Sequence, residues 1–132
     1  MEIQKFQVVL IAKDFDKTTA FYGTILGLPV THSWDRADGR GAYFGCGDGF
    51  IEVLDERSAE HVETLEHGDQ LGVTAKPLRI GVQVADVDAL HLELEKTGQH
   101  PTPLVDVPWG HRSFRVADPE GMVLTFYAER DV

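Results

Sequence analysis

Cysteine is almost absent from this sequence, which has one, Cys46, among 132 residues. An internal disulfide is thereby excluded, and a reducing cytoplasm is the expected location. No apolar run approaches the roughly 20 residues of a membrane span, so no membrane partner is expected. The opening segment MEIQKFQVVLIA alternates like a strand and has neither the charged region nor the cleavage site of a secretory signal.

Basic residues are also scarce, with 12 Lys and Arg against 22 Asp and Glu and a net charge of −10. A nucleic-acid partner needs a basic face for its phosphates, so none is expected. The composition, 42% apolar and 26% charged, is ordinary for a globular protein. A chain of this length can form one domain with a real core.

The chain contains the same order of elements twice. Hydrophobic alternation and turn residues predict strands at 3–12, 29–36, 40–46 and 49–54, with a helix at 16–27. They predict a second set of strands at 78–85, 101–105, 111–117 and 122–128, with a helix at 86–98. The segments KDFDK and ADVDA, which mark the two helix starts, lie 72 residues apart.

This repeat predicts the fold class. Module one covers residues 1–54 and module two residues 77–132, while the polar residues 55–76 are interpreted as a linker. Each module of about 50 residues is too small to bury its sheet alone. We therefore expect a single α+β domain in which two paired βαβββ modules form one curved mixed sheet, with helices outside and a cup inside.

Residues at the expected helix ends and turns fit this interpretation. Asp14 or Asp16 can cap the first helix, and Gly27 and Gly98 can end the two helices. The segments GCGDG and ADPEG are typical of tight turns between strands.

The segments DFDK, AFY and LGL, and later PWGHRSFRVADPEGMVL, resemble the glyoxalase/bleomycin resistance/dioxygenase family, the vicinal oxygen chelate superfamily. The resemblance covers nearly the whole chain and is nearest to the metal-free antibiotic-binding members. It implies paired βαβββ modules, assembly as a homodimer, and a small-molecule ligand held in the cup.

In metal-dependent members of that family, the first and last strands of each module supply one ligand each. The matching positions here are Gln7, Glu52, Arg79 and Thr125. Glutamine and glutamate offer oxygen ligands, but threonine is a weak ligand, and arginine has a permanent charge and no lone pair. We therefore expect no metal and no other cofactor. A Glu52–Arg79 pair, bridged by Gln7 or water, would replace the carboxylate–metal pair. A structural ion pair without a ligand role is the alternative.

Alternation along the strands extends this set into a candidate pocket lining, with the opposite face packed under the helices. Trp34 and Trp109 would lie near the rim, where they could stack on a planar ligand or simply pack. His111 could be a general base or a polar rim residue. The expected ligand-binding residues are Gln7, Trp34, Phe50, Glu52, Arg79, Gln83, Trp109, His111, Thr125 and Tyr127.

Three functions are compatible with these residues. The first is a metal-independent protein that binds and sequesters a small planar or cationic compound. The second is an enzyme: a metal-dependent isomerase, lyase or ring-cleaving dioxygenase, or a metal-free one with Glu52 or His111 as base, although Arg79 opposes the metal. The third is a degenerate module that serves assembly or regulation.

Overall fold

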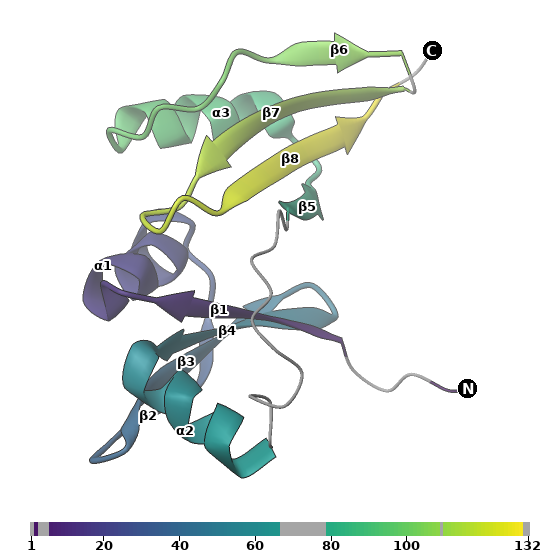
Figure 1. Ribbon diagram of the computed structural model, residues 1–132. Helices are drawn as coiled ribbons and strands as arrows, with labels where there is room; N and C mark the ends of the chain where they lie inside the picture. The colour runs from purple at the N-terminus through teal and green to yellow at the C-terminus, as the bar shows by residue number, and fades with distance from the viewer. Residues whose placement is uncertain (1, 3–5, 67–78, 109, 131–132) are drawn as a thin grey trace. The chain divides into compact units, whose positions relative to one another are not determined.

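The computed structural model describes residue 2 and residues 6–66, 79–108 and 110–130, with the backbone alone for residues 62–66 and 79. The chain divides into two compact units, Met1–Ala75 and Lys76–Val132 (Figure 1). Each unit contains one four-stranded mixed sheet. The predicted α+β fold with two βαβββ modules is confirmed.

The first unit is built around sheet A, in which the strands have the order β1-β4-β3-β2. Strands β1 and β4 are parallel, and the other two pairs are antiparallel. The elements are β1 (Gln7–Ala12), α1 (Phe15–Ala20) continued by the π-helix η1 (Phe21–Ile25), β2 (Val30–Arg36), β3 (Gly39–Cys46), β4 (Gly49–Asp55) and α2 (Glu56–Glu66).

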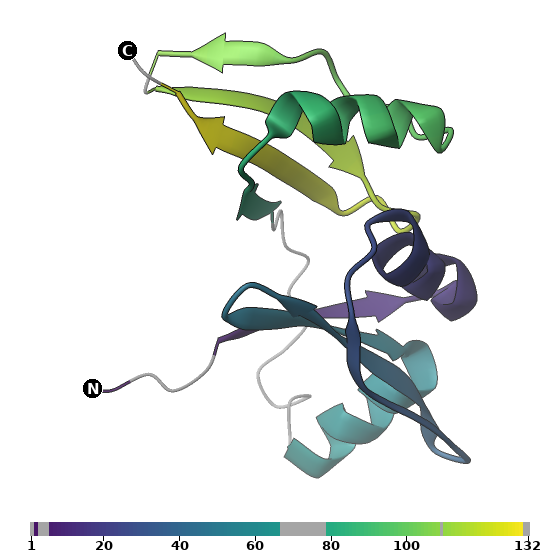
Figure 2. The same cartoon turned by 180° about the vertical axis from the view of Figure 1, so that it is seen from behind.

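The second unit repeats this topology in sheet B, with strand order β5-β8-β7-β6 and a parallel β5–β8 pair. Its elements are β5 (Arg79–Gln83), α3 (Val87–Lys96), β6 (Val105–Val107), β7 (His111–Ala117) and β8 (Val123–Glu129). Figure 2 shows α3 lying across one face of β7 and β8.

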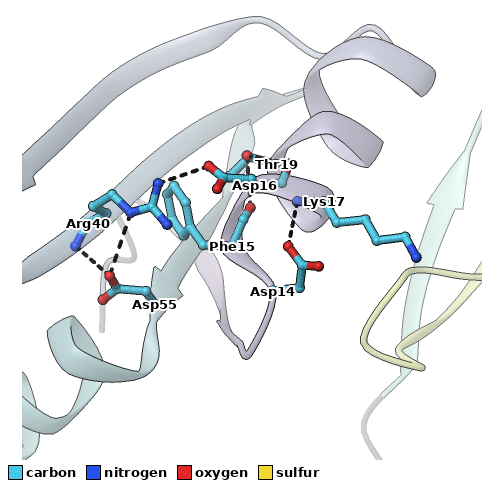
Figure 3. Close-up of polar contacts among 7 residues, drawn as sticks. All are labelled: Asp14, Phe15, Asp16, Lys17, Thr19, Arg40 and Asp55. Atoms are coloured by element: carbon cyan, nitrogen blue, oxygen red, sulfur yellow. Dashed lines mark hydrogen bonds and ion pairs between the residues drawn. The ribbon is translucent and has the colours of Figure 1, made fainter.

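The two helix starts have matching caps. The Asp14 carboxylate accepts a hydrogen bond from the Lys17 backbone N–H at 3.0 Å (Figure 3). The Asp86 carboxylate accepts one from the Ala89 backbone N–H at 3.0 Å. Of the two expected caps of α1, Asp14 is therefore the one used. Gly27 and Gly98 have φ values of 69° and 82°, a left-handed conformation that ends a helix and favours glycine.

Arg40 on β3 ties α1 to sheet A. Its guanidinium donates to Asp16 at 2.9 Å and lies over the Phe15 ring at 4.6 Å from the centroid (Figure 3). Asp55 at the end of β4 accepts from the Arg40 backbone N–H at 3.0 Å. One side chain thus links α1, β3 and β4, while its charge is neutralised by two carboxylates.

The core of each unit lies between its sheet and its first helix, as the alternation predicted. In sheet A, Phe44 packs against Tyr22 with ring centroids 6.1 Å apart, and both side chains are at most 1% exposed. In sheet B, Leu124 and Phe126 of β8 are buried, and the ring of Phe126 packs on Phe114, which contacts His91 of α3. The opposite side of each sheet carries the alternate set of residues, which in sheet A includes Gln7 and Glu52.

Helix α2 corrects the interpretation of residues 55–76 as a linker. Residues 56–66 are helical, Ser58 and Ala59 are buried, and the Ser58 N–H donates to the Asp55 carboxylate at 2.7 Å. Polar and charged residues occupy most of the sequence ERSAEHVETLE, and the segment was therefore interpreted as a linker. The rest of the expected linker, 67–76, lies outside the described residues. Figures 1 and 2 place α1 and α2 on opposite sides of sheet A.

The second strand of module two was predicted too early in the chain. It was expected at 101–105 and begins at Val105 instead. Pro101 and Pro103 have no backbone N–H to donate, which prevents a regular ladder there. Thr102, between them, still holds β7, because its N–H donates to the Arg115 carbonyl at 2.8 Å.

Candidate functional site

One side of each sheet carries the predicted site residues. In sheet A, register places Gln7 beside Phe50, and Glu52 between Val9 and Tyr43. This side of sheet A, called face A, has Val9 45% exposed and is covered at its Leu54 end, where Leu54 is buried. In sheet B, the side that carries His111, Thr125 and Tyr127 is called face B.

A hydrogen bond joins the two candidate residues of face A. The Gln7 side-chain amide donates to the Glu52 carboxylate at 2.7 Å, from the neighbouring strands β1 and β4. Glu52 is only 9% exposed. The negative charge of a carboxylate at this position acts strongly on nearby groups, because water screens a buried charge less than an exposed one.

Four aromatic rings, the aromatic cluster, lie on face A beside Glu52. Tyr43 is at its centre, with ring centroids 4.7 Å from Phe50, 5.3 Å from His32 and 5.6 Å from Trp34. His32 and Trp34 are 5.5 Å apart. Trp34 and Phe50 were predicted from the sequence as ligand-binding residues, whereas Tyr43 and His32 were not. Register supplies the missing signal, because Tyr43 pairs directly with Glu52 and His32 pairs with Tyr43.

Tyr43 is affected by its carboxylate neighbour. Partial burial, and then the negative charge of Glu52, raise the pKa of the Tyr43 phenol above its ordinary value. The phenol therefore remains protonated near neutral pH and available as a hydrogen-bond donor. Face A thus combines a protonated phenol, a carboxylate and aromatic rings in tilted and edge-to-face contact.

Gly41 makes room for Trp34 in this cluster. Gly41 pairs with Trp34 across β2 and β3, and a Cβ at Gly41 would overlap the indole ring. The Arg36 guanidinium lies 5.8 Å from the centroid of the same ring. The position of the indole therefore depends on a residue without a side chain.

We expect Gly41→Ala to displace the Trp34 ring and to lower the free energy of unfolding by about 1–3 kcal/mol, the usual cost of overpacking. A changed Trp34 emission maximum and a lower urea midpoint would show this. Gly81→Ala is the matched control, because a Cβ there meets nothing within 4 Å. Equal effects of the two substitutions would contradict this account of Gly41.

Face B contains a hollow of about 280 Å³ between β6, β7 and β8. Three predicted residues lie in its lining: His111, Thr125 and Tyr127. The His111 and Tyr127 rings are stacked, with centroids 4.4 Å apart. Ser113 and Arg115 also line the hollow and were missed, although both follow His111 at the strand period of two. Gln83 pairs with Tyr127 in register and is exposed, outside this lining.

Two of the predicted site residues cannot be placed. Trp109 lies outside the described residues, and the side chain of Arg79 is not described. The Glu52–Arg79 pair therefore remains a prediction.

The residues at the four family metal positions do not fit a divalent ion. Gln7 and Glu52 are hydrogen-bonded to each other, Thr125 is a weak ligand, and arginine at position 79 has no lone pair to offer. Within residues 6–66, 79–108 and 110–130, no three His, Cys, Asp or Glu side chains form a potential metal site. In the same part of the chain, no helix is long and apolar enough to cross a bilayer.

A larger hollow of about 700 Å³ lies on the other side of sheet A, between α1, η1, β2 and β3. Its cation, Arg40, is already neutralised by Asp16 and Asp55. It is also wide open and shares only Trp34 with the predicted site residues. Face A, with its buried carboxylate and more of the predicted site residues, is therefore the better candidate for a binding site than this larger hollow.

Comparisons with known proteins add to this geometry. Residues 6–126 match the sequence model of the Glyoxalase/Bleomycin resistance protein/Dioxygenase superfamily. An uncharacterized protein of Bacillus subtilis (strain 168), YraH, is 27% identical over 123 residues, which are 92% of this chain and 94% of that protein.

Solved structures show the same fold. An antibiotic binding protein from Streptomyces sp. CB03234, TnmS3, superposes with a TM-score of 0.70 at 21% identity, covering 98% of this chain and 96% of that one. A genomically encoded fosfomycin resistance protein from Listeria monocytogenes, FosX, gives 0.70 at 21% identity, covering 97% and 94%. At these identities the likeness concerns the fold.

Proposed function

The chain belongs to the glyoxalase/bleomycin resistance protein/dioxygenase superfamily, and we propose that it is a metal-independent protein that binds and sequesters a small, planar, cationic compound. The observation that carries this proposal is the aromatic cluster of His32, Trp34, Tyr43 and Phe50 beside the Glu52 carboxylate on face A.

Clustered aromatic rings and a buried carboxylate favour the same ligand chemistry. A cation over an aromatic ring gains roughly 0.5–1 kcal/mol at an exposed site and about 2 kcal/mol or more when desolvated. Glu52 adds Coulomb attraction from a position only 9% exposed. The net charge of −10 raises the local concentration of cations around the protein. A flat cationic ring system would interact favourably with the aromatic rings, with the Glu52 carboxylate and with the net negative charge of the protein.

The donor chemistry supports a binding protein more than a metal enzyme. A metal-dependent isomerase, lyase or dioxygenase needs an ion to hold and polarise its substrate, and the four family positions here do not supply such a ligand set. The name of TnmS3 describes an antibiotic binding protein, and that role is compatible with a stacking surface. Ligand capture by face A needs no catalytic group.

Fluorescence of Trp34 tests the proposal. In a Trp109→Phe background, Trp34 is the remaining tryptophan of the two. We expect N-methylacridinium to quench its emission saturably, because the flat cation stacks in the aromatic cluster. Neutral acridine, of almost the same shape, should bind more weakly in mildly alkaline buffer. Linear, non-saturable quenching by both compounds would contradict the proposal.

A further inference from the structure

The hollow on face B has an unusual charge for this protein. The chain has 22 Asp and Glu, yet none of the described residues that line the hollow is acidic. It contains the cation Arg115 and the hydroxyl residues Ser113, Thr125 and Tyr127. All of these side chains can donate hydrogen bonds, which is the chemistry of an oxyanion site.

Arg115 differs from the other arginine of β7. Arg112 points to the opposite side of the sheet and is held by Asp106 at 2.7 Å and by Asp88 at 3.1 Å. In the part of the chain that the structure describes, the Arg115 guanidinium makes no hydrogen bond and no ion pair. Its bidentate donor fork is therefore available to an acceptor from outside.

The backbone of Arg115 is fixed at the edge of the hollow. Its N–H donates to the Thr102 hydroxyl at 2.8 Å, and its carbonyl accepts from the Thr102 N–H at 2.8 Å. Register places Arg115 directly opposite Thr125, and Ser113 opposite Tyr127. The donors thus come from paired positions of two rigid strands rather than from a loop.

Apolar groups occupy the rest of the hollow. Val105 is 52% exposed and lines it together with Val107, while the stacked His111 and Tyr127 rings add a flat surface. The volume of about 280 Å³ is just below the roughly 300–1,000 Å³ of typical ligand pockets. The hollow therefore suits a small compound or one group of a larger compound.

We infer that the hollow on face B is an anion-binding site for the carboxylate or phosphonate group of a small organic anion. Arg115 pairs with the anion, Ser113 and Thr125 donate hydrogen bonds, and Val105 contacts the apolar body of the ligand. Glu129, opposite His111 in register, lies on the same face but outside the lining. This site goes beyond the proposed function and depends on the second unit alone.

Titration of the full-length, ¹⁵N-labelled protein tests the site. Benzoate is the anion, benzamide is its neutral analogue of the same shape, and phenylphosphonate supplies a tetrahedral anion, all at constant ionic strength. We expect benzoate to shift the amide signals of residues 111–115 and 125–127 saturably. Benzoate should bind about tenfold or more tightly than benzamide, since hydrogen bonds to charged groups are the stronger ones. The relative affinity of phenylphosphonate then decides between a planar and a tetrahedral group.

Arg115→Gln should reduce benzoate binding to the level of benzamide, while Arg115→Lys should keep part of the preference. Lys96→Gln, at the exposed end of α3, is the control with the same loss of charge. Unchanged signals elsewhere in the spectrum of Arg115→Gln would show that the variant folds. Equal binding of benzoate and benzamide, or a preference for benzoate that survives in Arg115→Gln, would overturn the inference. Neither result depends on the Trp34 assay.

Discussion

Glu52→Gln is expected to weaken the binding of N-methylacridinium by about tenfold to a hundredfold while leaving acridine binding unchanged. At about 5 Å and an effective dielectric constant near 20, two unit charges attract by roughly 3 kcal/mol, of which screening and desolvation remove a part. The amide of the variant can still accept the hydrogen bond from Gln7, whose donor atom lies 2.7 Å from the native carboxylate. The change therefore removes charge with little change of shape, and Trp34 quenching measures it.

The same variant has a second readout that does not require a ligand. Glu52 raises the pKa of Tyr43, so Glu52→Gln should lower the pKa of the phenol. The pKa should nevertheless stay above its ordinary value, because burial, the larger cause, remains. Difference absorbance titration against Tyr43→Phe reports this pKa. Glu93→Gln, on the exposed part of α3, is the matched control. A lower Tyr43 pKa together with unchanged affinity would show that the ligand does not meet the charge of Glu52.

Phe44→Ala is expected to lower the free energy of unfolding by about 3–5 kcal/mol, because it leaves a cavity beneath α1 and η1. The Phe44 side chain is 1% exposed and contacts Tyr22. It also packs so closely under η1 that a Cβ at Gly23 would lie 3.0 Å from its ring. Urea unfolding followed by far-ultraviolet circular dichroism measures the loss.

Phe6→Ala is the control for this substitution, since the same side chain at position 6 is 74% exposed. We expect it to change the free energy of unfolding by less than about 0.5 kcal/mol, as surface substitutions usually do. Similar losses for the two phenylalanines would contradict the assignment of Phe44 to the core.

Much of the fold could be predicted because each signal was local. Alternation placed Leu10 and Leu124 in the cores and Glu52 on the other face, and the caps marked the start of α1 and α3. Helix α2 was missed because polar and charged residues outnumber apolar ones in its sequence, although Asp55, which caps the Ser58 N–H, is a local signal of a helix start.

The candidate site was only partly predictable from sequence. Family positions pointed to Gln7 and Glu52, which the structure joins by a hydrogen bond. Tyr43 and Arg115 became visible only through strand register, which sets the neighbour of each residue. The family positions lie on the first and last strands of each module, so they did not point to Tyr43 on β3 or Arg115 on β7, the strands paired with β4 and β8.

The parallel pairing of β1 with β4 has a consequence for the order of folding. The hairpin of β3 and β4 joins residues that are close in sequence. In the described part of the chain, strand β1 pairs only with β4, which follows it in the chain after β2 and β3. Contacts between distant residues form late, because closing a long loop costs entropy before any contact compensates for it. The Gln7–Glu52 hydrogen bond crosses this pairing. We therefore expect face A to be completed in the last folding step of the first unit, after the aromatic residues of β2, β3 and β4 have already met.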